Sequence, residues 1–117
     1  MPTSTPGRPA VCGERGYLLS DLIPAVLTHN VAGAAEPGDV EQDLRCTLEA
    51  HTTGDHHSLV MELPGPDTGA VWTRWTRGHY PTTVTALLDC PSTDPDTAEP
   101  CCEFAGHPGA HSYEHRK

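Results

Sequence analysis

The chain has few of the residues that usually build a hydrophobic core. Hydrophobic residues make up 36% of its 117 positions and aromatic residues only 5%, whereas an average globular chain is roughly 45–50% apolar when glycine is counted. The longest uninterrupted apolar stretch, residues 22–27, is far shorter than the roughly 20 residues that a membrane-spanning helix needs. We therefore expect one small domain that does not associate with membranes and that needs stabilisation beyond packing.

Basic residues are also scarce. Lys and Arg number 7 against 16 Asp and Glu, which gives a net charge of −9. Nucleic-acid binding depends on cations that release counterions from phosphates, so we expect no nucleic-acid partner. The N-terminus lacks the apolar segment of a secretory signal peptide. This lack predicts a cytoplasmic protein whose thiols stay reduced.

The first half of the chain shows helical periodicity after an irregular start. Residues 1–16 have no periodicity and are expected to form a disordered arm, with a single domain over residues 17–117. Apolar residues from Leu18 recur at spacings of three and four, which predicts a helix that ends near Asn30. Pro37-Gly38-Asp39 predicts the start of a second helix, to about residue 51. On that helix Cys46 would face away from the apolar stripe, so it is left out of any metal site.

Beyond residue 57 the hydrophobic period changes to two. Strands are predicted over residues 58–63, 70–76 and 82–88, connected as a three-stranded antiparallel meander. Two N-terminal helices packed on one face of this sheet would make an α+β domain. One of the two tryptophans, Trp72 or Trp75, would anchor the helical layer, and the other would lie on the outer face.

Cysteine and histidine gather near the C-terminus. Residues 90–111 contain three cysteines and two histidines in a segment rich in Pro, Gly and Asp. Tetrahedral zinc takes four Cys or His ligands, and closely spaced pairs favour its binding. We predict a structural zinc ion held in this irregular loop by Cys90, Cys102, His107 and His111.

Two choices remain open at this predicted site. Adjacent side chains point apart in an extended backbone, so only one of Cys101 and Cys102 can easily face the metal. Cys102 is preferred, with Cys101 as its alternative. The absence of a Cys-x-x-Cys pair also leaves disulfide pairing, or a tail without any bridge, as alternatives to zinc.

Residues 101–112 read Cys-Cys-Glu-Phe-Ala-Gly-His-Pro-Gly-Ala-His-Ser. This segment resembles the Cys…Gly-His-x-Gly-x-His endings of many small uncharacterised actinobacterial and actinophage proteins. The preference for Arg over Lys and the bias towards Ala, Thr, Asp and Pro are similar to those of high-GC actinobacterial chains. The resemblance implies a metal-binding or motif-stabilised tail in a family of unknown role. It implies no catalytic residues.

Motifs that would indicate an enzyme are incomplete. Asp55-His56-His57 is similar to a triplet of manganese phosphoesterases, but those enzymes need further aspartate motifs, so we interpret it as a solvated turn. The chain has no His-x-Glu, which zinc deaminases require. A Cys-His nucleophile would also need an oxyanion site and a shaped pocket. An enzyme is therefore not expected.

The leading hypothesis is a zinc-stabilised cytoplasmic protein that binds another protein. The expected binding surface is the outer face of the sheet, formed by Trp72, Arg74 and Tyr80, because exposed aromatic residues beside Arg dominate interface energetics. One alternative is an acidic decoy that inhibits a basic nucleic-acid-binding surface, as a phage protein could. Another is a small metal-dependent hydrolase, which would keep an open coordination position.

Overall fold

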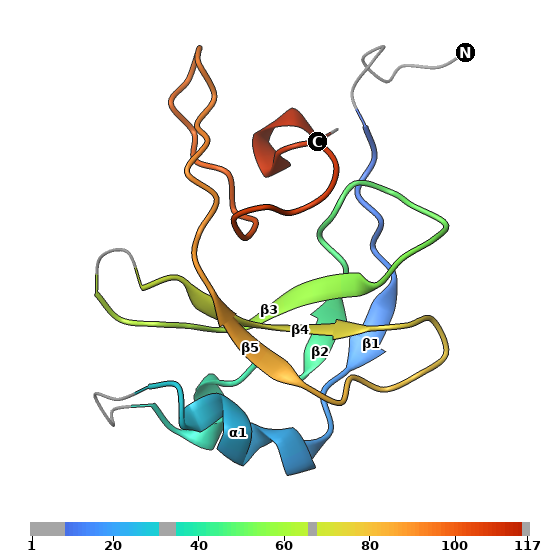
Figure 1. Ribbon diagram of the computed structural model, residues 1–117, viewed down its shortest axis with the longest axis vertical. Coiled ribbons are helices and arrows are strands. Elements are labelled where there is room, and N and C mark those ends of the chain that lie inside the picture. Colours follow the sequence, from blue (N-terminus) through green and yellow to red (C-terminus); the bar gives the residue numbers. More distant parts are fainter. Residues whose placement is uncertain (1–8, 31–34, 66–67, 116–117) are drawn as a thin grey trace.

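The computed structural model describes residues 9–30, 35–65 and 68–115 (Figure 1). It contains two antiparallel sheets and one short helix, α1 (Ile23–Leu27). In the first sheet, β1 (Arg15–Tyr17) pairs with β2 (Asp43–Arg45). In the second, the strand order is β3-β4-β5. These three strands are β3 (His56–Glu62), β4 (Ala70–Trp75) and β5 (Val84–Leu87).

The prediction of two N-terminal helices packed on a meander is wrong. Only α1, preceded by a 3-10 turn at Ser20–Leu22, is present in the first region. The second region begins with a 3-10 turn at Pro37–Asp39 and continues as β2. From residue 43 to 48, buried Leu44, Cys46 and Leu48 alternate with exposed neighbours. Leu44 and Leu48 are four residues apart, which fits both a helix and a strand, and counting Cys46 as apolar reveals the period of two.

The second half of the expected N-terminal arm is paired with this segment. Residues 1–8 of the arm lie outside the described residues. The amides of Cys12 and Gly13 donate hydrogen bonds to the carbonyls of Leu48 and Cys46, at 2.8 and 2.9 Å. In the other direction, the amide of Cys46 donates to the carbonyl of Glu14 at 2.9 Å. Hence Cys12 is held beside the end of β2.

Both tryptophans of β4 are buried, each 3% exposed. The ring of Trp75 lies directly on Gly16 of β1, where a Cβ would come within 2.6 Å of a ring carbon. Trp72 meets the ring of Phe104 edge-on, with 5.0 Å between the ring centroids. The expectation that one tryptophan lies on an outer face therefore fails, because β1 covers one ring and the C-terminal segment contacts the other.

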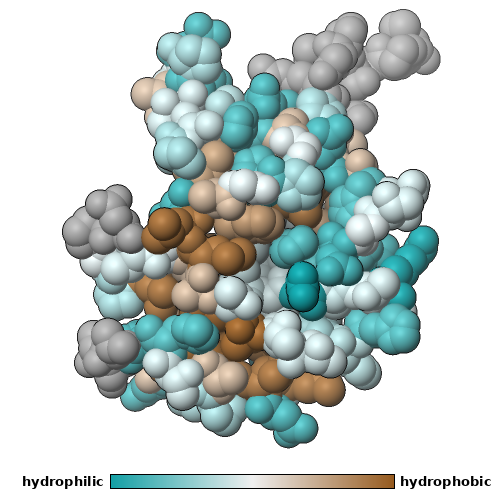
Figure 2. Space-filling view, viewed as in Figure 1, coloured by the Kyte–Doolittle hydropathy of each residue, from teal (hydrophilic) through white to brown (hydrophobic). Residues whose placement is uncertain are grey.

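The C-terminal segment, residues 88–115, extends away from the three-stranded sheet (Figure 1). Its described helical structure is a 3-10 turn at Ser112–Glu114. Figure 2 shows brown, hydrophobic residues gathered over the sheet and α1, whereas the upper end of the molecule is mostly hydrophilic on this face. No helix among the described residues is both long and apolar enough to cross a membrane. Packing therefore stabilises the sheet region more than the upper end.

Candidate metal centres

Four side chains converge at the upper end of the molecule. Cys90, Cys101, His107 and His111, which we call the C-terminal cluster, each offer one ligand atom, and these four atoms lie within 4.8 Å of one another. Cys90 Sγ is 3.6 Å from His111 Nδ1, and Cys101 Sγ is 3.5 Å from His107 Nε2. The two ring nitrogens, His107 Nε2 and His111 Nδ1, are 3.3 Å apart. This cluster could hold a metal ion.

These distances match the edges of a zinc-centred tetrahedron. With Zn–S bonds of about 2.3 Å and Zn–N bonds of about 2.0–2.1 Å, the edges are about 3.5 Å between S and N and about 3.3 Å between two N atoms. A thiol and an imidazole joined only by a hydrogen bond would satisfy one such distance. The C-terminal cluster satisfies three such distances at once. The N–N distance is joined to one S–N distance at His107 Nε2 and to the other at His111 Nδ1.

A hairpin and two glycine turns build the C-terminal cluster. Cys90 donates its amide to the carbonyl of Glu103 at 2.9 Å, and Cys101 donates its amide to the carbonyl of Ser92 at 3.0 Å. These bonds place the two thiols on facing strands of one hairpin. Gly106 and Gly109 then adopt φ of +82° and +77°, a conformation that glycine reaches without strain. These two turns bring His107 and His111 back to the thiols.

The groups around the C-terminal cluster orient its ligands. The second ring nitrogen of His107, Nδ1, lies 3.1 Å from the carbonyl oxygen of Pro108. A metal-bound histidine usually donates its other N–H to such an acceptor, which fixes its tautomer. The amide of Ser112 donates to Cys101 Sγ at 3.4 Å. That bond favours the thiolate, which is the form that binds metal.

The structure brings Cys101, and not Cys102, into this cluster. Cys101 is 5% exposed, whereas Cys102 is exposed and its Sγ lies 3.9 Å from the carbonyl oxygen of Pro100. The two side chains point apart, as expected of neighbours in extended backbone. The sequence identified this competition, and the pairing of Cys101 with Ser92 across the hairpin selects between the two residues.

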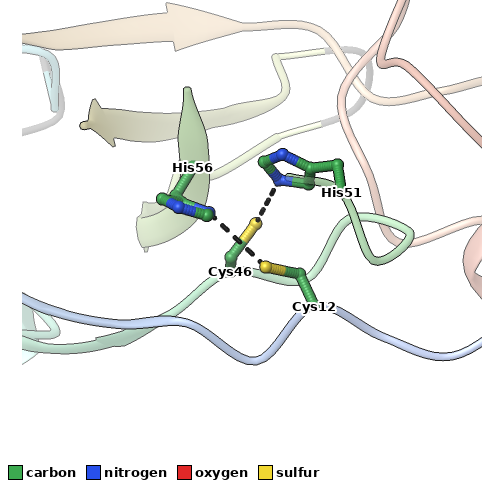
Figure 3. Close-up of side chains that lie close together, drawn as sticks. All are labelled: Cys12, Cys46, His51 and His56. Carbon is green, nitrogen blue, oxygen red and sulfur yellow. Dashed lines mark hydrogen bonds between the residues drawn. The ribbon is translucent and has the colours of Figure 1, made fainter. Parts of the chain in front are cut away.

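A second cluster lies where the segment before β1 and the segment after β2 meet the start of β3; Figure 3 shows its four side chains. Cys12, Cys46, His51 and His56 form this N-terminal cluster, and their ligand atoms also lie within 4.8 Å of one another. Cys12 Sγ is 3.4 Å from His56 Nδ1, and Cys46 Sγ is 3.6 Å from His51 Nε2. Both distances match the S–N edge of a zinc tetrahedron. This cluster, too, could hold a metal ion.

Sequence reasoning missed all four residues of the N-terminal cluster, including His51, which falls only at the end of the predicted second helix. Cys12 falls in the expected arm, Cys46 points inward because its segment is extended, and His56 is 6% exposed at the start of β3. One signal was available. Four residues separate Cys46 from His51, and four separate His51 from His56, the same interval that separates Cys102 from His107 in the predicted site.

Burial shifts the pKa of three side chains of the two clusters. It raises the pKa of the Cys46 thiol to about 11 and also raises the pKa of Cys101. Burial lowers the pKa of His56. In these three groups, burial therefore favours the protonated thiol and the neutral imidazole. A divalent ion with two thiolates and two neutral imidazoles has no net charge, which suits a buried site.

The expected partner surface does not form as a single patch. Trp72 is buried against Phe104, while Arg74 and Tyr80 are exposed. Arg74 Nε lies 3.8 Å from a carboxylate oxygen of Asp55. Tyr80 instead lines a groove of about 430 Å³ between β1 and the segment that follows β4.

Comparisons with known proteins add no assignment. Neither a family model, nor a curated protein, nor a solved structure matches this chain.

Proposed function

We propose that this is a small protein whose fold is held together by structural zinc. The observation that carries the proposal is the agreement of three distances in the C-terminal cluster with the edges of a zinc tetrahedron. Two sulfur and two nitrogen ligands in this geometry favour zinc over harder cations such as magnesium or calcium, which prefer oxygen. Reduced thiols are required, so we place the protein in the cytoplasm.

A structural role fits the ligand set better than hydrolysis does. Catalytic zinc usually has three protein ligands and an open position for water, whereas structural zinc has four. The C-terminal cluster supplies four protein ligands from one hairpin and the turn that follows it. The ion would therefore join His107 and His111 to the hairpin and leave no position for a substrate.

Metal analysis tests this role. The protein purified under reducing conditions without chelator should contain zinc, and cobalt substitution should give the intense visible absorption of tetrahedral Co²⁺. We expect His107→Ala to remove at least one equivalent of metal, because it removes one of four ligands. His79→Ala, at an exposed histidine outside both clusters, is the control. Metal-free wild-type protein, or equal metal contents in both variants, would refute the proposal.

A protein-binding role is the second candidate, favoured by the groove beside Tyr80. The groove is lined by Arg15, Tyr17, Trp75, His79 and Tyr80, together with two glycines. Tyr17 and Tyr80 are 42% and 61% exposed. Within the described residues, Arg15 forms no ion pair with Asp or Glu, and it faces Arg45 directly across β1 and β2. Because like charges in that position repel, we propose an acidic peptide segment with an apolar side chain as the partner.

Peptide selection tests the groove. A display library should yield acidic peptides that bind the wild-type protein, and Tyr80→Ser should weaken them by about 10-fold or more, because aromatic anchors dominate interfaces. Leu88→Ser is the matched control, since Leu88 is also 61% exposed and does not line the groove. Equal losses in the two variants, or no enrichment of acidic peptides, would contradict this role.

A further inference from the structure

The N-terminal cluster offers the same ligand types as the C-terminal cluster, two thiols and two imidazoles, with all four ligand atoms within 4.8 Å of one another. Its two S–N distances, 3.4 and 3.6 Å, are those of a zinc tetrahedron. His51 Nδ1, the nitrogen that does not face the thiols, lies 2.7 Å from the carbonyl oxygen of Thr53. This is the outer contact expected of a metal-bound histidine. Cys46 and His56 are buried and Cys12 and His51 are half-buried, and two thiolates with two neutral imidazoles would neutralise a divalent ion.

The ligand loops of the two clusters contact each other through Glu49. Glu49 lies between Cys46 and His51, two ligands of the N-terminal cluster. Its Oε1 accepts a hydrogen bond of 2.8 Å from the amide of Ala110, which directly precedes His111 of the C-terminal cluster. The contact is close: a Cβ on Gly109 would come within 2.8 Å of the Cβ of Glu49. The two loops thus fit together at a glycine.

A second hydrogen bond joins the loops at the buried side chain of Glu103. Thr47, the residue after Cys46, donates its hydroxyl to Glu103 Oε1 at 2.8 Å. Glu103 is 1% exposed and follows Cys101 by two residues. Beside this bond, the ring of His57 packs on Phe104 with 5.0 Å between centroids. Each loop therefore contributes part of the surface that positions the other.

We propose that the N-terminal cluster holds a second structural zinc ion and that the two ions bind cooperatively, with Glu49 as the main link. The inference rests on the proposed zinc-stabilised fold. An ion in either cluster fixes its own loop. The other loop then packs against a loop that is already ordered. The second ion therefore has to offset the conformational entropy lost by its own loop alone, and not that of both loops. Each Zn²⁺ displaces two thiol protons as it binds two thiolates and two imidazoles.

Native mass spectrometry measures this cooperativity directly. Excess zinc should give two ions per chain. At half saturation, two equal and independent sites would leave about half of the chains with one ion, whereas a tenfold coupling leaves about a quarter. We expect the wild-type protein to show about a quarter or less. A single ion per chain in excess zinc, or one-zinc chains at half or more, would overturn the inference.

Substitutions at Glu49 identify the link. Glu49→Ala removes the acceptor of the Ala110 amide and should raise the one-zinc fraction towards a half. Glu49→Gln keeps an oxygen acceptor and should retain the wild-type distribution. Glu62→Ala, at an exposed residue of β3, should leave the distribution unchanged. Equal distributions for Glu49→Ala and Glu62→Ala would refute the role of Glu49.

Removing one cluster separates this inference from the proposed function. Cys46→Ser should abolish the N-terminal ion and weaken zinc binding at the C-terminal cluster by about 10-fold, because the coupling is reciprocal. If Cys46→Ser leaves both the metal content and the remaining affinity unchanged, the second site is refuted while the C-terminal zinc stands. If no variant contains zinc, the proposed function itself fails.

Discussion

Replacing His107 with alanine should lower the melting temperature by roughly 12 °C or more. Loss of a structural metal is among the few single changes that cost about 3 kcal/mol or more, and in a domain slightly larger than 100 residues each 1 kcal/mol corresponds to about 4 °C. The effect should be large because the hairpin and turns of residues 88–115 depend on few apolar contacts. Thermal melts followed by circular dichroism, with and without chelator, measure it.

The chelator supplies the control for this prediction. It should lower the melting temperature of the wild-type protein at least as far as His107→Ala does, because it withdraws metal from both clusters. His79→Ala should melt like the wild type in both conditions. Identical melting curves for wild type and His107→Ala would show that the C-terminal cluster contributes nothing to stability.

Serine substitutions at the adjacent Cys101 and Cys102 should have opposite outcomes. Cys101→Ser removes a buried ligand sulfur and should lose metal, with a fall in the free energy of unfolding of about 3 kcal/mol or more. Cys102→Ser changes an exposed side chain outside the cluster and should stay within about 0.5 kcal/mol of wild type. Denaturant unfolding and metal analysis of the two purified variants measure both effects.

This pair of variants keeps chain length, charge and local sequence nearly constant. A general effect of removing a thiol at this hairpin would appear in both proteins. Metal loss in Cys102→Ser, with Cys101→Ser unaffected, would mean that the other thiol of the pair is the ligand. Equal metal contents in the two variants would mean that neither thiol is required.

The sequence predicted the second half of the fold better than the first. The strong alternation after residue 57 predicts three strands, and the structure has strands at His56–Glu62, Ala70–Trp75 and Val84–Leu87. In the first half, Leu44 and Leu48 fit either period. The deciding residue was Cys46, which is buried beside Cys12, a residue 34 positions earlier in the chain that no local pattern connects to it.

The two clusters also differ in how easily the sequence predicts them. The C-terminal ligands lie within 22 residues of sequence, so composition alone draws attention to them. The N-terminal ligands extend from Cys12 to His56 and meet only because residues 10–14 pair with residues 46–50. That pairing is a tertiary interaction, and the segment around Cys12 has no periodicity that would predict it.

The hairpin that carries Cys90 and Cys101 also has a kinetic consequence. Hairpins form in about 1–10 µs, and backbone hydrogen bonds within this hairpin, from Cys90 to Glu103 and from Cys101 to Ser92, bring its two thiols together. In contrast, Cys12 and His56 are separated by 44 positions, and contacts between distant positions form more slowly. The C-terminal cluster should therefore assemble first during folding and offer zinc its earliest binding site. The segment that carries Cys12 would then pair last, against a C-terminal cluster that is already assembled.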